Sequence, residues 1–241
     1  MKSFSLIWSA AVMLALSAQG GIIYSSFPNS GNIPDGNPAG SSGTATVSGF
    51  LPSISDISVK LNISGGYNGD LYAYLSYGGV LVPLLNRVGV TSGNAFGYGD
   101  SGFNITLSSA GANDVHNYGN YSPSFNGSGQ LTGTWQPDGR AVDPLSAPSA
   151  FDSASRVNFG SFNGLDPNGT WTLFVADLSS GGQSQMVSWE LDITAVVPEP
   201  VNVALGIFGG VSLLTVAARS RPVRRRVGRW KAAVDHWIDA V

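Results

Sequence analysis

Alternating apolar and polar residues predict several short β-strands in the middle of the chain. Every second residue is apolar in the stretches 57–63, 171–175 and 187–193. The stretches 70–77 and 103–107 are also rich in aliphatic and aromatic residues. Successive side chains of a strand point to opposite faces, so this spacing gives a strand one apolar face for a core to bury. The residues expected on buried faces are Ile57, Val59, Leu61, Ile63, Trp171, Leu173, Val175, Val187, Trp189, Leu191 and Ile193.

Turn-forming residues separate the predicted strands. Ser-Gly-Gly-Gln at 180–183 predicts a hairpin-type turn between two of them, and the Gly-rich residues 64–69 precede the strand at 70–77. No amphipathic helix pattern occurs in residues 21–196. Many short strands joined by such turns are typical of an all-β fold, an antiparallel β-sandwich. Residues 109–155, rich in Ser, Gly, Asn and Pro, are expected to form long surface loops with a few edge strands.

Composition and charge narrow the classes of function. The 241 residues include 32 Gly, only 11% are charged, and none is Cys. A chain without Cys has no disulfide, thiolate metal ligand or cysteine nucleophile. Seven of the twelve Lys and Arg residues lie between Arg219 and Lys231, whereas residues 19–198 hold four basic residues against twelve acidic ones. The body of the chain therefore lacks the basic patch that nucleic acid requires, and nucleic acid is excluded as a partner.

The N-terminal residues 1–20 have the order of a secretory signal peptide. Lys2 supplies a positive charge, residues 4–16 form an apolar stretch, and small residues follow it. The apolar stretch is too short to span a bilayer comfortably. We expect export of the chain with cleavage between Ser17 and Gly21, and a buried N-terminal helix is the alternative.

A second apolar stretch lies near the C-terminus. Residues 201–218 carry no charge. As a helix they would cover about 27 Å, close to the thickness of the hydrocarbon core of a bilayer. A cluster of arginines follows at once, and such clusters stay on the cytoplasmic side. The sequence therefore predicts a transmembrane helix with an exported body and a cytoplasmic C-terminus. The arginines are Arg219, Arg221, Arg224, Arg225 and Arg226.

The triplet Pro198-Glu199-Pro200 comes directly before this apolar stretch. The triplet, the span and the arginine cluster, in this order, make residues 197–226 resemble the PEP-CTERM sorting signal of Gram-negative bacteria. The resemblance implies that an exosortase-type processing enzyme recognises these residues and cleaves near the triplet. It also implies a mature body in the periplasm, at the cell surface or in the extracellular matrix, associated with exopolysaccharide or biofilm.

Residues 227–241 continue the chain past the arginines, where proteins with that signal usually stop. Their apolar residues share one helical face, which predicts a short amphipathic helix on the cytoplasmic surface of the membrane. A frayed tail is the alternative. The residues on the apolar face are Val227, Trp230, Val234, Trp237, Ile238 and Val241.

Three motifs in the body resemble the P domain, also called the Homo B domain, of proprotein convertases. They are Gly69-Asp70-Leu71 before a strand, the strand 168–173 that leads to Asp177, and Ser-Trp-Glu-Leu at 188–191. The resemblance spans about residues 33–194 within the predicted domain of residues 21–196. It implies a jelly-roll-type β-sandwich, which in convertases lies beside a subtilisin-like protease and stabilises it. The His-Thr pair common before the first motif is Ser64-Gly65 here.

Two strings in residues 97–102 imitate catalytic or cofactor motifs. The G-x-G-x-x-G string needs a helix after it, but a predicted strand follows. Gly-Asp-Ser-Gly around Ser101 imitates a protease nucleophile turn, which needs a histidine before the serine. The body's one histidine, His116, comes after it and is expected to be a loop residue. The sequence therefore predicts no catalytic residues and no enzyme activity, although a Ser101–His116 triad on another topology is the alternative.

Carboxylates and tyrosines are the remaining candidates for binding. Asp70 and Asp177 lie beside predicted turns, where carboxylates together with carbonyl oxygens build Ca²⁺ sites, although Asp is also an ordinary turn residue. Tyrosine rings stack on sugars, so contact with carbohydrate is one interpretation and core packing is the other. The tyrosines are Tyr67, Tyr72, Tyr74, Tyr77, Tyr98, Tyr118 and Tyr121.

These observations favour an exported, envelope- or matrix-associated protein that binds or supports other molecules and is not catalytic. Its partners would be the membrane, an exosortase-type enzyme, and an exopolysaccharide or a matrix protein. The alternative is an accessory P domain for a separate subtilisin-like serine endopeptidase.

Overall fold

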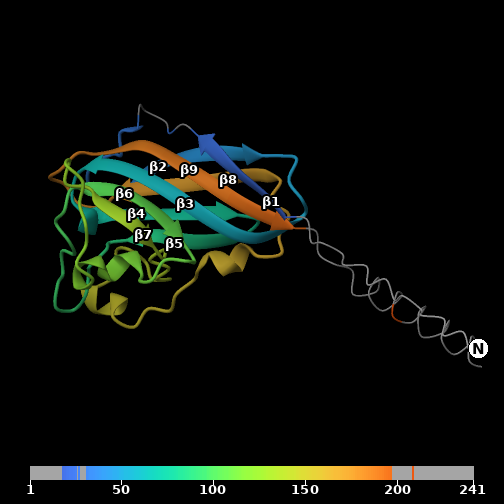
Figure 1. Ribbon diagram of the computed structural model, residues 1–241. Helices are drawn as coiled ribbons and strands as arrows, with labels where there is room; N and C mark the ends of the chain where they lie inside the picture. The colour runs from blue at the N-terminus through green and yellow to red at the C-terminus, as the bar shows by residue number, and fades with distance from the viewer. Residues whose placement is uncertain (1–17, 26, 28–30, 197–207, 209–241) are drawn as a thin grey trace, which may run out of the picture. The chain divides into compact units, whose positions relative to one another are not determined.

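Two β-sheets packed face to face form the body of the protein (Figure 1). The structure is a computed structural model, and it describes residues 18–25, 27, 31–196 and 208. The strands are β1 (Ala18–Ser25), β2 (Asn37–Val47), β3 (Ser53–Gly65), β4 (Leu71–Tyr77), β5 (Val80–Asn86), β6 (Gly102–Ser108), β7 (Leu131–Trp135), β8 (Gly169–Asp177) and β9 (Ser184–Val196). Short 3-10 helices lie in the connections: η2 (Asn68–Asp70), η3 (Val115–Asn120), η4 (Pro148–Phe151) and η5 (Phe159–Phe162).

The strand order is that of a jelly roll. One sheet has the order β1-β9-β3-β6-β7 and the other has the order β2-β8-β4-β5. Neighbouring strands are antiparallel except β6 and β7, which are parallel. Without β7, each sheet contributes four strands in the order that two interleaved Greek keys produce. The predicted all-β, jelly-roll-type antiparallel β-sandwich is confirmed.

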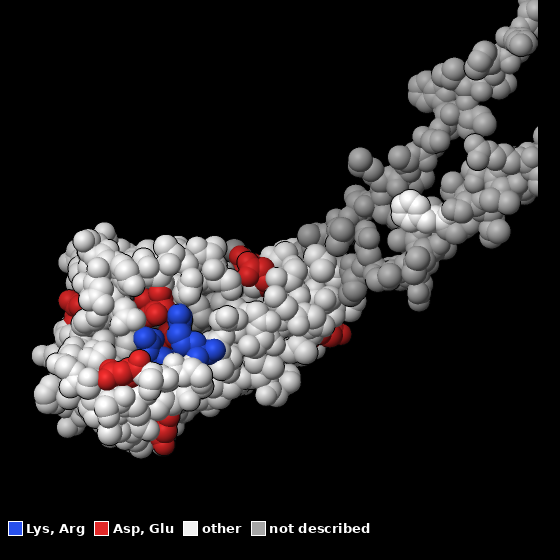
Figure 2. All heavy atoms as spheres, turned by 90° about the horizontal axis from the view of Figure 1, so that it is seen from below, with Lys and Arg blue, Asp and Glu red and all other residues white. Residues whose placement is uncertain are grey.

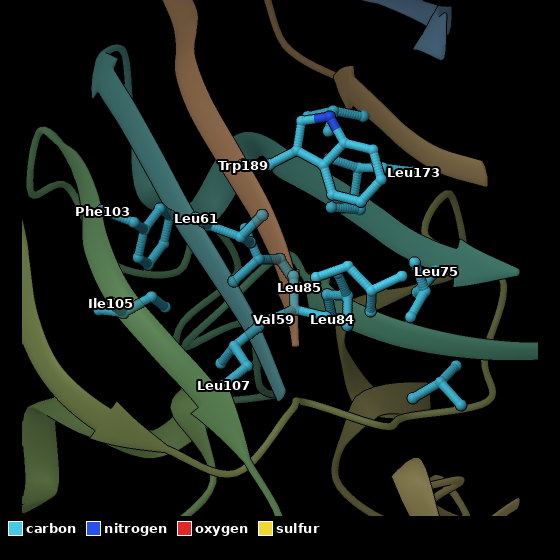
Figure 3. Packing of buried hydrophobic residues seen from close by; sticks show 14 of the residues in the cluster. Val59, Leu61, Leu75, Leu84, Leu85, Phe103, Ile105, Leu107, Leu173 and Trp189 are labelled. Atoms are coloured by element: carbon cyan, nitrogen blue, oxygen red, sulfur yellow. The ribbon is translucent and has the colours of Figure 1, made fainter. Parts of the chain in front are cut away.

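The apolar faces of both sheets meet in one core. Figure 3 shows side chains of β3, β6 and β9 directed toward those of β4, β5 and β8. The alternation that predicted β3 and β8 is correct, because Val59, Leu61, Trp171 and Leu173 are all fully buried. The residues of this core lie between Ile33 and Ile193, so the segment 18–196 contains all of it.

The last strand departs from the predicted alternation at one residue. Trp189, Leu191 and Ile193 are buried as expected, but Val187 is 55% exposed and Met186 is buried instead. The register between β3 and β9 shifts at this point, which is a β-bulge. A bulge inserts one extra residue and reverses the faces of the residues beyond it, so the prediction for Val187 was wrong.

The turn between β8 and β9 is not the predicted hairpin. β8 pairs with β2 and β4, whereas β9 pairs with β1 and β3 in the other sheet. Residues 178–183 therefore cross from one sheet to the other. The apolar faces of β8 and β9 thus face each other across the core, and the two strands are not neighbours in one sheet.

The sandwich has two distinct ends. At one end Ala18, the first residue of β1, is the register partner of Val196, the last residue of β9; we call this end the terminal pole. The opposite end carries η2 and residues 178–183, and we call it the loop pole. Figure 1 shows β9 running between these ends with its arrowhead at the terminal pole. The chain therefore enters and leaves the sandwich at the same end.

The predicted targeting segments lie mostly outside the described residues. Residues 18–20, the last three of the predicted signal peptide, belong to β1. The sorting triplet, the arginine cluster and the tail at 227–241 are outside the described part, as is the predicted span at 201–218 apart from Phe208. Among the described residues, no helix is long and apolar enough to cross a bilayer.

Candidate binding site

Ser101 and His116 do not form a catalytic pair. The Ser101 hydroxyl is exposed and donates to the carbonyl oxygen of Gly66 at 3.3 Å. The ring of His116 is fully buried, with Nδ1 2.7 Å from Oδ2 of Asp138 and Nε2 2.9 Å from the carbonyl oxygen of Val90. The serine and the histidine are thus each committed to other partners. The same segment is no nucleotide loop, because β6 and not a helix follows it.

His116 belongs to a buried polar network, so the prediction that it is an ordinary loop residue was wrong. A carbonyl oxygen can only accept a hydrogen bond, so Nε2 donates to Val90. Nδ1 lies within hydrogen-bond distance of Asp138, so both ring nitrogens have partners inside the fold. Residues 109–155, predicted as surface loops, in fact bury His116, Tyr118, Asp138 and Phe151 against the sandwich. Their strand β7 does lie at a sheet edge, as predicted.

Two arginines complete this network near the surface. Arg140 lies 3.2 Å from Asp138 and 3.5 Å from Asp114, and Arg156 lies 3.4 Å from Asp114. Arg156 also donates to the carbonyl oxygens of Pro137 and Asp138, both at 2.8 Å. Figure 2 shows the basic side chains of this face gathered beside acidic ones on a largely uncharged surface. Because these guanidinium groups already have internal partners, they serve to hold the loops together.

The tyrosines divide between the core and the surface. Tyr118 is buried, whereas Tyr67 is 54% exposed. On the outer face of the four-stranded sheet, Tyr74 stacks on Phe174 with ring centroids 4.9 Å apart. Rings stacked in this way each cover one face of the other, which leaves less aromatic surface for a ligand. Tyr67 is therefore a better candidate for contact with a ligand than the tyrosines of β4.

The loop pole brings Asp70 and Asp177 together, the two residues predicted as calcium ligands. Leu178, next to Asp177, donates its backbone amide to the carbonyl oxygen of Asp70 at 2.9 Å. Burial raises the pKa of Asp70, and the negative charge of Asp35 adds to this effect. The hydrogen bond from Ser179 and the positive charge of Arg87 lower the pKa, but burial outweighs them. In the described residues, however, no group of three or more His, Asp or Glu side chains is placed to hold a metal ion.

Asp177 is the more buried of the two carboxylates. Its oxygens accept hydrogen bonds from the Ser184 hydroxyl at 3.0 Å and from the Ser179 amide at 3.4 Å. Burial raises the pKa of Asp177 to about 6, and the negative charges of Asp70 and Asp35 add to this effect against those hydrogen bonds. Asp177 is thus an acid whose charged form the fold disfavours.

Stability is therefore expected to fall between about pH 4 and pH 6 through Asp177. Its folded pKa lies above the ordinary value of 3.8, so the folded state binds the proton more tightly and loses this advantage as pH rises. A pKa shift of this size corresponds to about 3 kcal/mol of the free energy of unfolding. The Asn side chain in Asp177→Asn does not titrate, so the free energy of unfolding should change less between pH 4 and pH 6 in this variant. Urea unfolding of the segment 18–196 across this pH range measures the change.

The exposed Asp143 provides the matched control for this experiment. Asp143→Asn should keep the pH dependence of the natural protein. An unchanged pH dependence in Asp177→Asn would contradict the assignment. Adding Ca²⁺ at neutral pH tests the calcium hypothesis in the same samples, because a bound ion would stabilise the natural protein but not Asp177→Asn.

A surface cavity of about 310 Å³ lies at the loop pole beside these carboxylates. This volume is at the lower end of the range found for small-molecule sites. The cavity joins three loops that are far apart in the sequence: the η2 turn, the loop before β6, and the crossover between β8 and β9. The residues that line it are Tyr67, Asp70, Phe96, Ser179, Ser180 and Gly181, and we call this set the loop-pole pocket.

The sequence predicted part of this pocket. Asp70 was a candidate as a metal ligand and Tyr67 as a sugar contact, but Phe96 was missed. Phe96 lies in a loop of mainly Ser, Gly, Asn and Ala, two residues before Tyr98, where no periodicity indicates its role. An aromatic residue in such a loop was the available signal.

Comparison with known proteins gives weak structural matches, among them two structures of one bacterial protease. No family model matches the chain, and neither does any curated protein. The serine protease of Aeromonas sobria in complex with its chaperone matches with 15% identity and a TM-score of 0.42, over 77% of this chain and 28% of the other. The same protease alone matches with 15% identity and a TM-score of 0.41, over 76% and 28%.

The chain thus spans 28% of the length of the protease chains that it matches. At these TM-scores, nothing about activity or partners follows from the matches. The resemblances to the PEP-CTERM signal and to the P domain have no matching family model and stay predictions from sequence motifs.

Proposed function

We propose that this protein is an exported, non-catalytic binding module of the bacterial cell envelope or extracellular matrix. In this proposal residues 1–20 direct export, and residues 197–226 hold the precursor in the membrane until an exosortase-type enzyme cleaves near Pro198-Glu199-Pro200. The sandwich carries the binding surface and associates with an exopolysaccharide or a matrix protein.

The pairing of Ala18 with Val196 is the observation that supports this proposal most directly. Both predicted targeting segments are joined to the sandwich at the terminal pole. The loop-pole pocket lies at the other end of β9, whose 13 residues span about 40 Å in an extended strand. A domain tethered at the terminal pole would keep this pocket accessible to molecules outside the cell.

The proposed lack of catalysis is supported by the arrangement of Ser101 and His116. Their hydrogen bonds lead to other partners, and the buried carboxylate of Asp138 anchors the histidine within the fold. A nucleophile and its base must lie within hydrogen-bond reach of each other, and these two residues are not paired in that way.

The second candidate function is that of an accessory domain for a separate subtilisin-like serine endopeptidase. The P-domain-like motifs around Asp70, Asp177 and Trp189 favour it, and all three lie in or beside strands of the sandwich. The two functions differ in the genes expected nearby. A neighbouring exosortase gene supports the sorting proposal, and a neighbouring protease gene supports the accessory function.

Glu199→Ala is expected to block processing in the native host. Pro198 and Pro200 disfavour a regular helix, so the triplet would stay extended and open to a processing enzyme, with Glu199 as its charged recognition element. The natural exported protein should lack residues beyond about 200, and the variant should accumulate uncut in the membrane fraction. Mass spectrometry of both protein termini measures this.

Equal recovery of peptides from 230–241 and from the sandwich in the exported protein would overturn the sorting proposal. That result would make residues 201–218 a permanent anchor. Lys60→Ala serves as the control, because Lys60 is an exposed residue of β3 far in sequence from the triplet, and the variant should be processed like the natural protein.

A further inference from the structure

The loop-pole pocket presents two aromatic side chains to solvent. Phe96 is 82% exposed and Tyr67 is 54% exposed, although large apolar side chains elsewhere in the sandwich are mostly buried. Both line the same cavity as the carboxylate of Asp70. Exposing an aromatic ring to water is unfavourable, so a ring held in this way is a candidate for contact with a ligand.

The loop that carries Phe96 is fixed to the η2 turn on one side. The backbone amide of Gly69 donates to the carbonyl oxygen of Tyr98 at 2.8 Å, and the amide of Tyr98 donates to that of Val88 at 3.0 Å. A Cβ atom at Gly69 would collide with the carbonyl oxygen of Phe96, so this close approach requires glycine.

Side chains fix the same loop a second time. The Asn94 amide donates to the carbonyl oxygen of Gly97 at 2.9 Å. The Arg87 guanidinium reaches the carbonyl oxygens of Gly69 and Ala95, both at 3.4 Å. Arg87 adopts φ of 49°, a strained value for a residue other than glycine, to take up this position. Phe96 is therefore preorganised, and a ligand would not have to order the loop on binding.

The polar groups of the pocket suit hydroxyl-bearing ligands. Asp70 offers carboxylate oxygens as acceptors, and Ser179 and Ser180 carry hydroxyls that donate and accept. The adjacent Gly181 is held in place because its amide donates to both oxygens of Asp35, at 3.2 and 3.3 Å. Among the described residues, no Lys or Arg lines the cavity, so an anionic ligand would find no basic side chain in its wall.

We propose that the loop-pole pocket binds a pyranose ring of a neutral extracellular polysaccharide. The apolar face of the ring would stack on Phe96 and Tyr67, and its hydroxyls would donate to Asp70 and exchange hydrogen bonds with Ser179 and Ser180. A sugar ring combines one apolar face with a rim of hydroxyls, and the pocket combines the complementary groups. This inference rests on the proposed function, because it names the ligand class of that binding module.

The test is binding of the purified full-length protein, in detergent, to insoluble cellulose, chitin, mannan and xylan. We expect it to pellet with at least one of them. Phe96→Ala should weaken that binding about tenfold or more, the effect of removing a central aromatic contact. Because Phe96 is mostly exposed, the variant should melt at the same temperature as the natural protein. Leu145→Ala, which removes a 64% exposed side chain outside the pocket, should bind normally.

Asp70→Asn distinguishes a neutral sugar from a cationic partner. With a sugar, the binding should persist in 0.5 M NaCl, roughly the point at which the screening length falls below 5 Å. Binding that disappears in salt and in Asp70→Asn, but survives Phe96→Ala, would overturn the proposal in favour of a cationic ligand. Failure to bind any of the polysaccharides would also overturn it. Neither result depends on export or processing, so the sorting proposal stands or falls separately.

Discussion

Asp138→Ala is expected to destabilise the sandwich by about 3–5 kcal/mol, the usual cost of removing one partner from a buried ion pair. Asp138 is fully buried, and one of its oxygens lies 2.7 Å from Nδ1 of His116 and accepts from the amide of Asn86 at 3.0 Å. Its other oxygen lies 3.2 Å from Arg140. The substitution leaves all three groups without this partner. Urea unfolding of the segment 18–196, followed by tryptophan fluorescence, measures the loss.

A second substitution separates the pair from general damage to the core. In the Asp138→Ala background, His116→Phe removes one of the three groups that lost their partner and keeps a ring beside Phe151, so it should restore part of the stability. Glu190→Ala removes an exposed partner of Lys60 and should cost about 1 kcal/mol or less. A cost for Asp138→Ala as small as that of Glu190→Ala would show that the buried pair contributes little.

Trp171→Ala is expected to cost about 3–5 kcal/mol of the free energy of unfolding, because it leaves a large cavity in the core. Trp171 is fully buried, stacks on Tyr77 with ring centroids 4.1 Å apart, and contacts Phe162 in a tilted arrangement with centroids 5.1 Å apart. Its indole nitrogen also donates to the carbonyl oxygen of Pro167 at 3.0 Å. The loss should appear as a lower urea midpoint with an unchanged slope.

Trp171 and Trp189, whose side chains are both fully buried, provide a matched comparison. The indole nitrogen of Trp189 has no hydrogen-bond partner among the described residues, whereas that of Trp171 has one. Trp189→Phe removes an unsatisfied donor, and Trp171→Phe strands an acceptor, so Trp171→Phe should be the more costly of the two. Equal costs would contradict this account of the polar contacts, although not the burial of either ring.

The strands β3, β4, β6, β8 and β9 were predictable because each is defined by its own residues, whereas β1, β2 and β5 were not predicted. Alternation at 57–63 and at 171–175 follows from burial of one face, and it identified β3 and β8 correctly. The predicted hairpin at 180–183 failed because a turn-forming sequence specifies a reversal and not the sheet that the next strand joins. Val187 failed because a bulge depends on the register with β3, which no local pattern records.

The binding pocket was predictable only in part because it is assembled from distant loops. Asp70 stood out through a short motif, and Tyr67 through its residue type. Phe96 matters only because Gly69, far away in the chain, permits its loop to approach the η2 turn. The burial of His116 likewise depends on Asp138 and Val90, which the sequence does not connect to it.

The pairing of Ala18 with Val196 also decides how the domain would bear mechanical load. Hydrogen bonds between strands run perpendicular to them. A force that pulls Ala18 away from Val196 would break the hydrogen bonds between β1 and β9 one after another. Each of these steps would need little force. A force between the loop pole and Val196 would instead run along β9, which is bonded on both sides by β1 and β3, and would strain many bonds at once. The same strand is therefore weak against peeling from its partner and strong against pull along its length.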